Sequence, residues 1–137
     1  MAFLKQSLLL LCVSTVLLGK MPEEELIMNV LKLLQANEKA LKVFDHHPSH
    51  LLEKYAFEHR VQECTDAHLI YGETFETLPF TCKKLPRFST EYEQFQKDEK
   101  VIGAFYWRKG RPQLRFNEKR CKDFNITLPQ ELAQYAY

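Results

Sequence analysis

The chain has 137 residues, with 19 Lys and Arg against 18 Asp and Glu, which gives a formal net charge of +1 at pH 7. Hydrophobic residues make up 45% of the chain and aromatic residues 12%, with only 4 glycines. This composition can bury a core and argues against an intrinsically disordered chain. The balanced charge gives no global attraction to nucleic acid or to a membrane surface.

The first 19 residues have the pattern of a secretory signal peptide. Lys5 supplies a basic start, residues 7–18 (SLLLLCVSTVLL) are uncharged and apolar, and Gly19 is a small residue near a cleavage point. A bilayer-spanning helix needs roughly 20 apolar residues, so this run is too short to span, and no second run of spanning length follows. The sequence predicts a leader at residues 1–19 and a single secreted domain at residues 20–137. An uncleaved signal anchor is the alternative, because Leu17 is bulky where a small residue is usual.

The next stretch predicts the first element of the domain. Pro22 and the acidic run 23–25 are typical of a helix start. Apolar residues then recur on one face as far as Phe44, which predicts an amphipathic helix of about 20 residues, with a bend near Asn37. Residues 45–48 (DHHP) are expected to end it.

The second half of the chain has the alternating pattern of β-strands. Residues 51–60 fit a helical turn or a strand, residues 68–71 and 74–82 read as two strands, and residues 83–100 read as a long connection. Residues 101–107 and 112–116 predict a hairpin about a tight turn. The predicted fold class is therefore α+β, with the N-terminal amphipathic helix packed on an antiparallel sheet of about four strands.

Three cysteines follow the leader, and an odd number in an oxidising compartment leaves one thiol unpaired. Three pairings are open, of which Cys64–Cys82 closes the shortest loop. Cys121 would then be buried or available for a disulfide-linked dimer. Asn125 begins the sequence Asn-Ile-Thr, an N-glycosylation acceptor if the chain enters the secretory pathway.

A basic run follows the aromatic strand 101–107. It contains one acid, Glu118, and its candidate binding residues are Arg108, Lys109, Arg111, Arg115, Lys119 and Arg120. Such a local positive field can bind anionic polysaccharide, a bacterial surface or nucleic acid. The alternative is that these residues simply form the solvated face of the hairpin, with Leu114 and Phe116 packed inward.

Trp107 is a second candidate contact in this hairpin, because an exposed aromatic residue at a hairpin tip can anchor a protein partner. Strand alternation places Phe105 and Trp107 on one face and Tyr106 on the other. In the alternative interpretation, Phe105 and Trp107 belong to the core.

Residues 45–50 (DHHPSH) are the densest group of potential metal ligands. Their spacing matches no structural zinc motif, and Pro48 interrupts any helix that would align them, so no metal and no cofactor is predicted. The chain also carries no G-x-S-x-G or catalytic cysteine signature, so it is not expected to be an enzyme.

The stretch 102–107 (IGAFYW), with Leu114 and Cys121 after it, is similar to the closing hairpin of secreted cystatins. The resemblance implies a cystatin-like layout over residues 22–122. The Q-x-V-x-G inhibitory loop is replaced by residues 67–72 (AHLIYG), which implies a non-inhibitory relative.

The expected function is that of a secreted, non-enzymatic binding protein, acting through loops or the basic hairpin on an extracellular protein or an anionic polysaccharide. Nucleic acid is not an expected partner. The alternatives are a cysteine protease inhibitor, a host-defence or polysaccharide-binding protein that uses residues 108–122, and, less favoured, a cytokine-like ligand.

Overall fold

The computed structural model describes residues 23–37 and 41–137. The predicted signal peptide at residues 1–19 therefore lies outside the described residues. Among these, the elements in chain order are α2 (Glu23–Asn37), β1 (Val43–Asp45), α3 (Leu51–Lys54), β2 (Arg60–Val61), η1 (Cys64–Asp66), β3 (Leu69–Gly72), η2 (Phe80–Cys82), β4 (Arg87–Ser89), α4 (Tyr92–Lys97), β5 (Val101–Arg108), β6 (Arg111–Phe116), α5 (Glu118–Asp123) and α6 (Gln130–Ala133).

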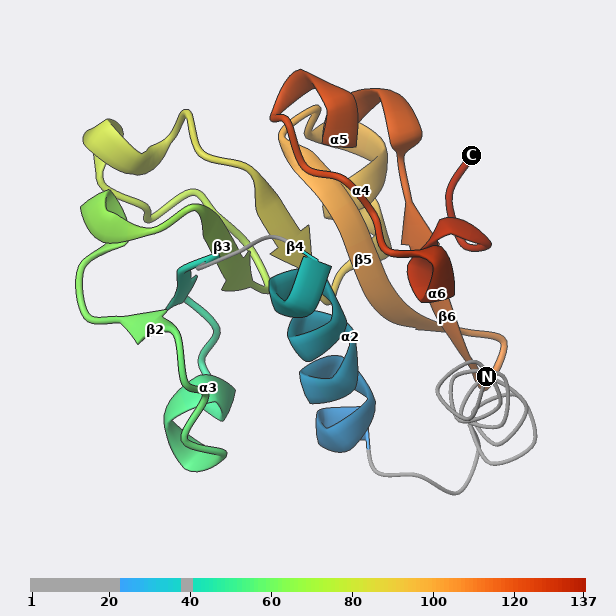
Figure 1. Ribbon diagram of the computed structural model, residues 1–137, viewed down its shortest axis with the longest axis horizontal. Helices are drawn as coiled ribbons and strands as arrows, with labels where there is room; N and C mark the ends of the chain where they lie inside the picture. The colour runs from blue at the N-terminus through green and yellow to red at the C-terminus, as the bar shows by residue number, and fades with distance from the viewer. Residues whose placement is uncertain (1–22, 38–40) are drawn as a thin grey trace.

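The strands form one 6-stranded sheet in the order β2-β1-β3-β4-β5-β6 (Figure 1). Every neighbouring pair from β2 to β5 is parallel, and only β5 and β6 are antiparallel. The predicted antiparallel sheet of about four strands is therefore wrong, although the predicted hairpin at its end is present.

Short strands explain the error. β1 has 3 residues, β2 has 2 and β4 has 3, and alternation cannot be recognised over so few positions. Val43 and Phe44 continued the apolar pattern of the predicted helix, whereas α2 ends at Asn37 and these two residues enter the sheet. The predicted strand at residues 74–82 is a loop that ends in η2, with Phe75 and Leu78 buried over the sheet.

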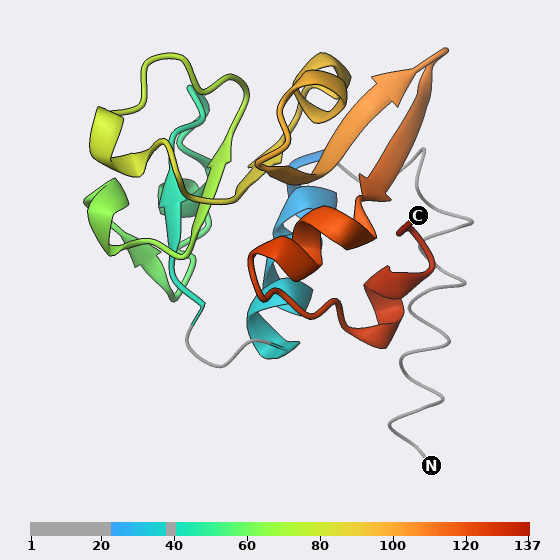
Figure 2. The ribbon, with the colours of Figure 1, turned by 90° about the horizontal axis from the view of Figure 1, so that it is seen from above.

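The two faces of the sheet are covered by different elements (Figure 2). Helix α2 lies on one face with α6, and its residues Leu31 and Leu34 are fully buried there with Phe105 and Phe116 of the hairpin. The opposite face is covered by α4 and by the η1 and η2 segments, which contribute Phe95, Cys64 and Cys82 to a second core. The layered arrangement leaves the β5–β6 hairpin projecting at one end of the sheet.

The hairpin turn has the geometry that the sequence predicted. Lys109 and Gly110 both have positive φ, 53° and 74°. Two central residues with positive φ are typical of the type I′ turn, whose twist matches that of the flanking strands. Gly110 adopts this conformation without a steric cost, whereas Lys109 adopts it despite its Cβ.

Candidate functional site

The hairpin register brings three arginines onto one face. Arg108 lies directly opposite Arg111, and two positions further along, Tyr106 lies opposite Gln113. Arg115 lies opposite Ala104, so it shares this face with both pairs. Two like charges directly opposite each other are destabilising in a sheet, which makes the Arg108–Arg111 pair a place where a bound anion would relieve repulsion.

Tyrosine rings support two of these arginines. The guanidinium of Arg108 lies 5.5 Å from the ring centroid of Tyr92, and that of Arg115 lies 5.3 Å from the ring centroid of Tyr137. The rings of Tyr92 and Tyr106 are 4.7 Å apart. We call the surface formed by these six residues the Arg–Tyr face: Arg108, Arg111, Arg115, Tyr92, Tyr106 and Tyr137.

Tyr106 lies at the centre of the Arg–Tyr face. Tyr106 is only 4% exposed. Burial raises the pKa of its hydroxyl, and the positive charges of Arg115 and Arg108 act in the opposite direction. Both guanidinium groups are therefore close enough to influence this hydroxyl, although they come from different strands.

The six basic residues predicted as one patch divide into two groups. Lys119 pairs with Asp123 at 3.5 Å. Arg120 donates to the carbonyl oxygens of Phe95 and Val101 at 2.6 and 3.0 Å, so it joins α5 to the end of α4 and the start of β5. These two residues are occupied by contacts within the fold.

The remaining group is Arg108, Lys109, Arg111 and Arg115. All four are exposed, and within residues 23–37 and 41–137 none of them forms an ion pair with a carboxylate. The alternation expected for a solvated face is also present, since Phe116 is fully buried and Leu114 is half-buried on the other side of β6. The hairpin thus concentrates positive charge that has no carboxylate partner among the described residues, whereas Lys119 and Arg120 do not add to it.

Trp107 points to the opposite face of the hairpin and is 47% exposed, whereas Phe105 beside it is buried. The core interpretation therefore holds for Phe105 only. Trp107 lines a hollow of about 440 Å³ at the point where β5 continues past the end of β4. We call it the carboxyl-edge hollow, and its lining residues are Glu23, His47, Glu73, Thr90, Glu91, Tyr92, Glu93, Tyr106 and Trp107.

The carboxyl-edge hollow lies where ligands bind in many open parallel sheets, beyond the carboxyl ends of the strands. Its polar centre is His47, which stacks on Tyr71 with ring centroids 5.1 Å apart and lies 3.1 Å from the hydroxyl of Thr90. Nδ1 of His47 accepts the backbone N–H of Ser49 at 3.1 Å, so Nε2 carries the proton of the neutral ring. His47 therefore donates to Thr90 and cannot act as the base that would activate this hydroxyl.

The other groups of the histidine-rich segment are used within the fold. The two carboxylate oxygens of Asp45 accept the backbone N–H groups of His47 and Leu52, each at 2.9 Å, which fixes the turn into α3. His46 lies 3.0 Å from the hydroxyl of Thr77. Within the part of the chain that the structure describes, no group of three or more His, Cys, Asp or Glu side chains is arranged to hold a metal ion.

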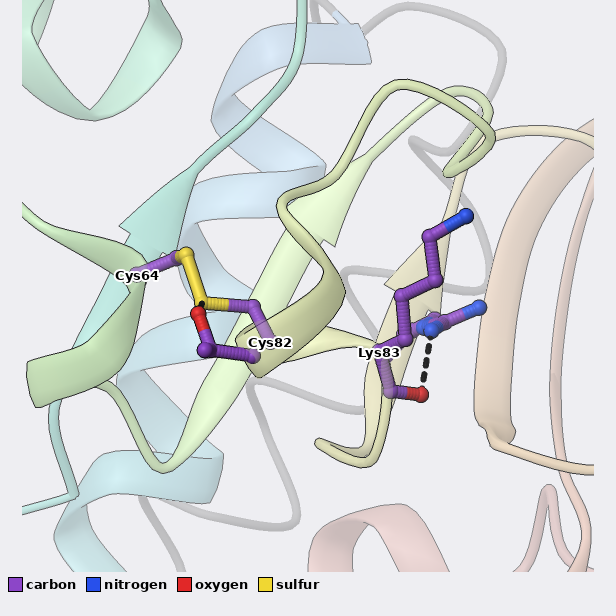
Figure 3. The surroundings of a disulfide bond; sticks show 5 residues. Cys64, Cys82 and Lys83 are labelled. Carbon is purple, nitrogen blue, oxygen red and sulfur yellow. Dashed lines mark hydrogen bonds between the residues drawn. A yellow bond between two sulfur atoms is a disulfide. The ribbon is translucent and has the colours of Figure 1, made fainter.

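The cysteines are in two different states. Cys64 and Cys82 form a disulfide with their Cα atoms 6.1 Å apart, and it joins η1 to η2 (Figure 3). Cys121 is a free thiol that is 2% exposed, and burial raises its pKa to about 11. A dimer linked through Cys121, which the odd cysteine count allowed, would require this thiol to leave the core.

The structure also places the predicted glycosylation site and the stretch compared with the cystatin loop. Asn125 is exposed, with φ of 57°, just after α5. Of residues 67–72, compared above with the inhibitory loop of cystatins, Leu69–Gly72 form the buried strand β3, and His68 before them is exposed. No helix among the described residues combines the length and the apolar character that crossing a bilayer requires.

Comparisons with known proteins define the fold without defining a family. No family model and no curated protein matches the chain. A solved structure described as a conserved domain protein from Vibrio cholerae O1 biovar El Tor strain N16961 is similar, with a TM-score of 0.58 at 12% sequence identity. The match covers 85% of this chain and 60% of that one, so this chain spans less than two thirds of its structural relative. At this identity the likeness concerns the fold alone.

Proposed function

We propose that the protein is an exported, non-enzymatic binding protein that recognises an anionic partner through the Arg–Tyr face. The observation that carries this proposal is the set of three arginines on one face of the hairpin, exposed and without carboxylate partners among the described residues. Lys109 adds a fourth exposed positive charge at the turn.

The chemistry of arginine supports an anionic partner. A guanidinium presents paired donors that match the oxygens of a sulfate, a carboxylate or a phosphate group. Stacking on Tyr92 and Tyr137 limits the freedom of Arg108 and Arg115 before any ligand arrives. Less side-chain entropy is then lost on binding, so more of the interaction energy contributes to affinity.

Export is part of the same proposal and depends on the apolar leader in the sequence. A disulfide such as Cys64–Cys82 persists in oxidising compartments, and an exposed Asn125 is accessible to a glycosyltransferase where one is present. The expected partner is an extracellular protein or an anionic polysaccharide. Nucleic acid is less favoured, because the chain as a whole has balanced charge.

Elution from immobilised heparin, used as a general sulfated polyanion, tests the proposal. We expect the wild-type protein to elute at moderate salt and the triple variant Arg108→Gln, Arg111→Gln, Arg115→Gln to elute near the start of the gradient. The matched control removes three lysines that are paired with carboxylates, Lys97→Gln, Lys119→Gln, Lys122→Gln, and should elute close to the wild type. Wild-type protein in the flow-through, or equal losses in both triple variants, would refute a specific site.

A further inference from the structure

We infer, on the basis of the proposed function, that the partner is a linear polysaccharide with recurring anionic groups, which lies lengthwise along the hairpin from the Arg108–Arg111 pair to Arg115. The register of β5 and β6 supplies this axis, because all three arginines lie on one face at two separate levels of the ladder.

The spacing of the arginines favours a ligand longer than a single small anion. Arg111 and Arg115 are four residues apart on one strand, so their Cα atoms are separated by about 13 Å. Side chains on a strand stand roughly perpendicular to the sheet, so guanidinium groups at these two levels are better matched by two anionic groups than by one. A chain that carries anionic groups at intervals can contact them together, and the second contact gains from the first through effective concentration.

The groups between the two levels are uncharged and polar. Tyr106 and Gln113 lie opposite each other there. Gln113 is half-buried, and its amide has both a donor and an acceptor. Hydroxyl groups of a sugar placed between two anionic substituents are suited to the amide of Gln113, whereas a continuous row of phosphates would find no cation at this level.

One feature favours a polysaccharide over single-stranded nucleic acid, and a second sets the direction of the bound chain. Proteins that bind single strands stack bases on open aromatic faces. Here Arg108 already lies over Tyr92, Arg115 lies over Tyr137, and the ring of Tyr106 is buried. The carboxylates of the carboxyl-edge hollow, including Glu73 and Glu91, lie on the β4 side of the hairpin and repel a polyanion of either class from that direction. The remaining path is along the strands.

Calorimetric titration with heparin-derived oligosaccharides of increasing length tests the inference. For the wild-type protein, we expect affinity to rise by about tenfold once the oligosaccharide reaches from Arg111 to Arg115, the value of one additional charge-assisted contact. Arg115→Gln should abolish that rise. The double variant Arg108→Gln, Arg111→Gln should weaken binding at every oligosaccharide length. The control double variant Lys119→Gln, Lys122→Gln should change neither the affinity nor its rise with length.

Several results would overturn this inference while leaving the proposed function in place. These are an affinity independent of length, a rise with length that survives Arg115→Gln, or equally tight binding of an oligothymidylate with the same number of charges. Failure of the proposed function is distinct, because the wild-type protein would then bind no oligosaccharide of any length.

Discussion

Arg87 and Asp98 form an ion pair that joins the start of β4 to the turn before β5, with Nη1 of Arg87 2.5 Å from a carboxylate oxygen of Asp98. Arg87 is only 7% exposed. Its Nη2 donates to the carbonyl oxygen of Lys83 at 2.7 Å, close to the disulfide, while its Nε is buried and has no hydrogen-bond partner among the residues that the structure describes. The pair therefore links the η2 segment to the centre of the sheet.

Removing the acid from this pair should be costly. Asp98→Ala leaves a buried guanidinium uncompensated, so we expect the free energy of unfolding to fall by about 3 kcal/mol, as measured by urea denaturation. Glu93→Ala removes an exposed partner of Lys97 and should cost less than about 1 kcal/mol. Equal costs for the two variants would show that the Arg87–Asp98 pair is solvated rather than buried.

The disulfide should stabilise the fold through the chain entropy of the unfolded state. Cys64 and Cys82 are 18 residues apart, and closing a loop of about this size contributes about 3 kcal/mol. The double variant Cys64→Ala, Cys82→Ala should lose this amount in urea denaturation. Wild-type protein unfolded under reducing conditions should give the same value as the variant, and an unchanged midpoint in either case would contradict the prediction.

Lys109 in the hairpin turn is expected to lower the free energy of unfolding relative to glycine at the same position. Its φ of 53° lies in the left-handed region, which costs a non-glycine residue about 1–2 kcal/mol. Glycine at this position would avoid that cost, but part of the stabilisation would be offset because glycine gives the unfolded chain more conformational entropy. Lys109→Gly should therefore raise the free energy of unfolding by about 0.5–1 kcal/mol. Under the proposed function the same variant should elute earlier from heparin. Gly110→Lys, the reverse change at the neighbouring position, should destabilise the hairpin.

The free energy of unfolding should decrease as the pH falls below neutrality, and His46 should contribute to this decrease. Burial and the nearby charge of Arg87 lower the pKa of His46 below its ordinary value of 6.5, and Asp45 opposes this effect. Between the folded and the unfolded pKa, the unfolded state binds more protons, so acidification favours unfolding. Urea denaturation from about pH 7.5 to pH 5 should show this loss, and His46→Gln should reduce it. An identical pH dependence in the variant would assign the effect to other groups.

The sequence was sufficient to predict the hairpin and the strand at residues 68–71, which corresponds to β3, but not the other strands or the parallel pairing. The alternation over residues 101–107 and a glycine beside Lys109 determine the β5–β6 pair locally, and the register follows from the turn. The parallel strands β1, β2 and β4 are held by helices and loops between them, and their two or three residues carry no periodic pattern. Parallel pairing depends on crossover connections, which a pattern search over short windows does not detect.

The candidate site was predictable to a similar extent. Alternation along β6 was enough to place Arg111 and Arg115 on one face. The stacking of Tyr92 and Tyr137 on the arginines depends on α4 and on the end of the chain folding back against the hairpin, which no local signal reveals. Conversely, Lys119 and Arg120 appeared available in the sequence and are occupied by Asp123 and by backbone carbonyls. Partners of surface charges are determined by tertiary structure.

Titration of the ¹⁵N-labelled protein with a heparin-derived oligosaccharide, followed by NMR, tests the central claim most directly. The Nε–Hε signals of Arg108, Arg111 and Arg115 should shift together and saturate at the same ligand concentration, while the signal of Arg120, which is bonded to backbone carbonyls, should not move. Saturating shifts confined to another surface, or no shifts at all, would contradict an anion site on the Arg–Tyr face.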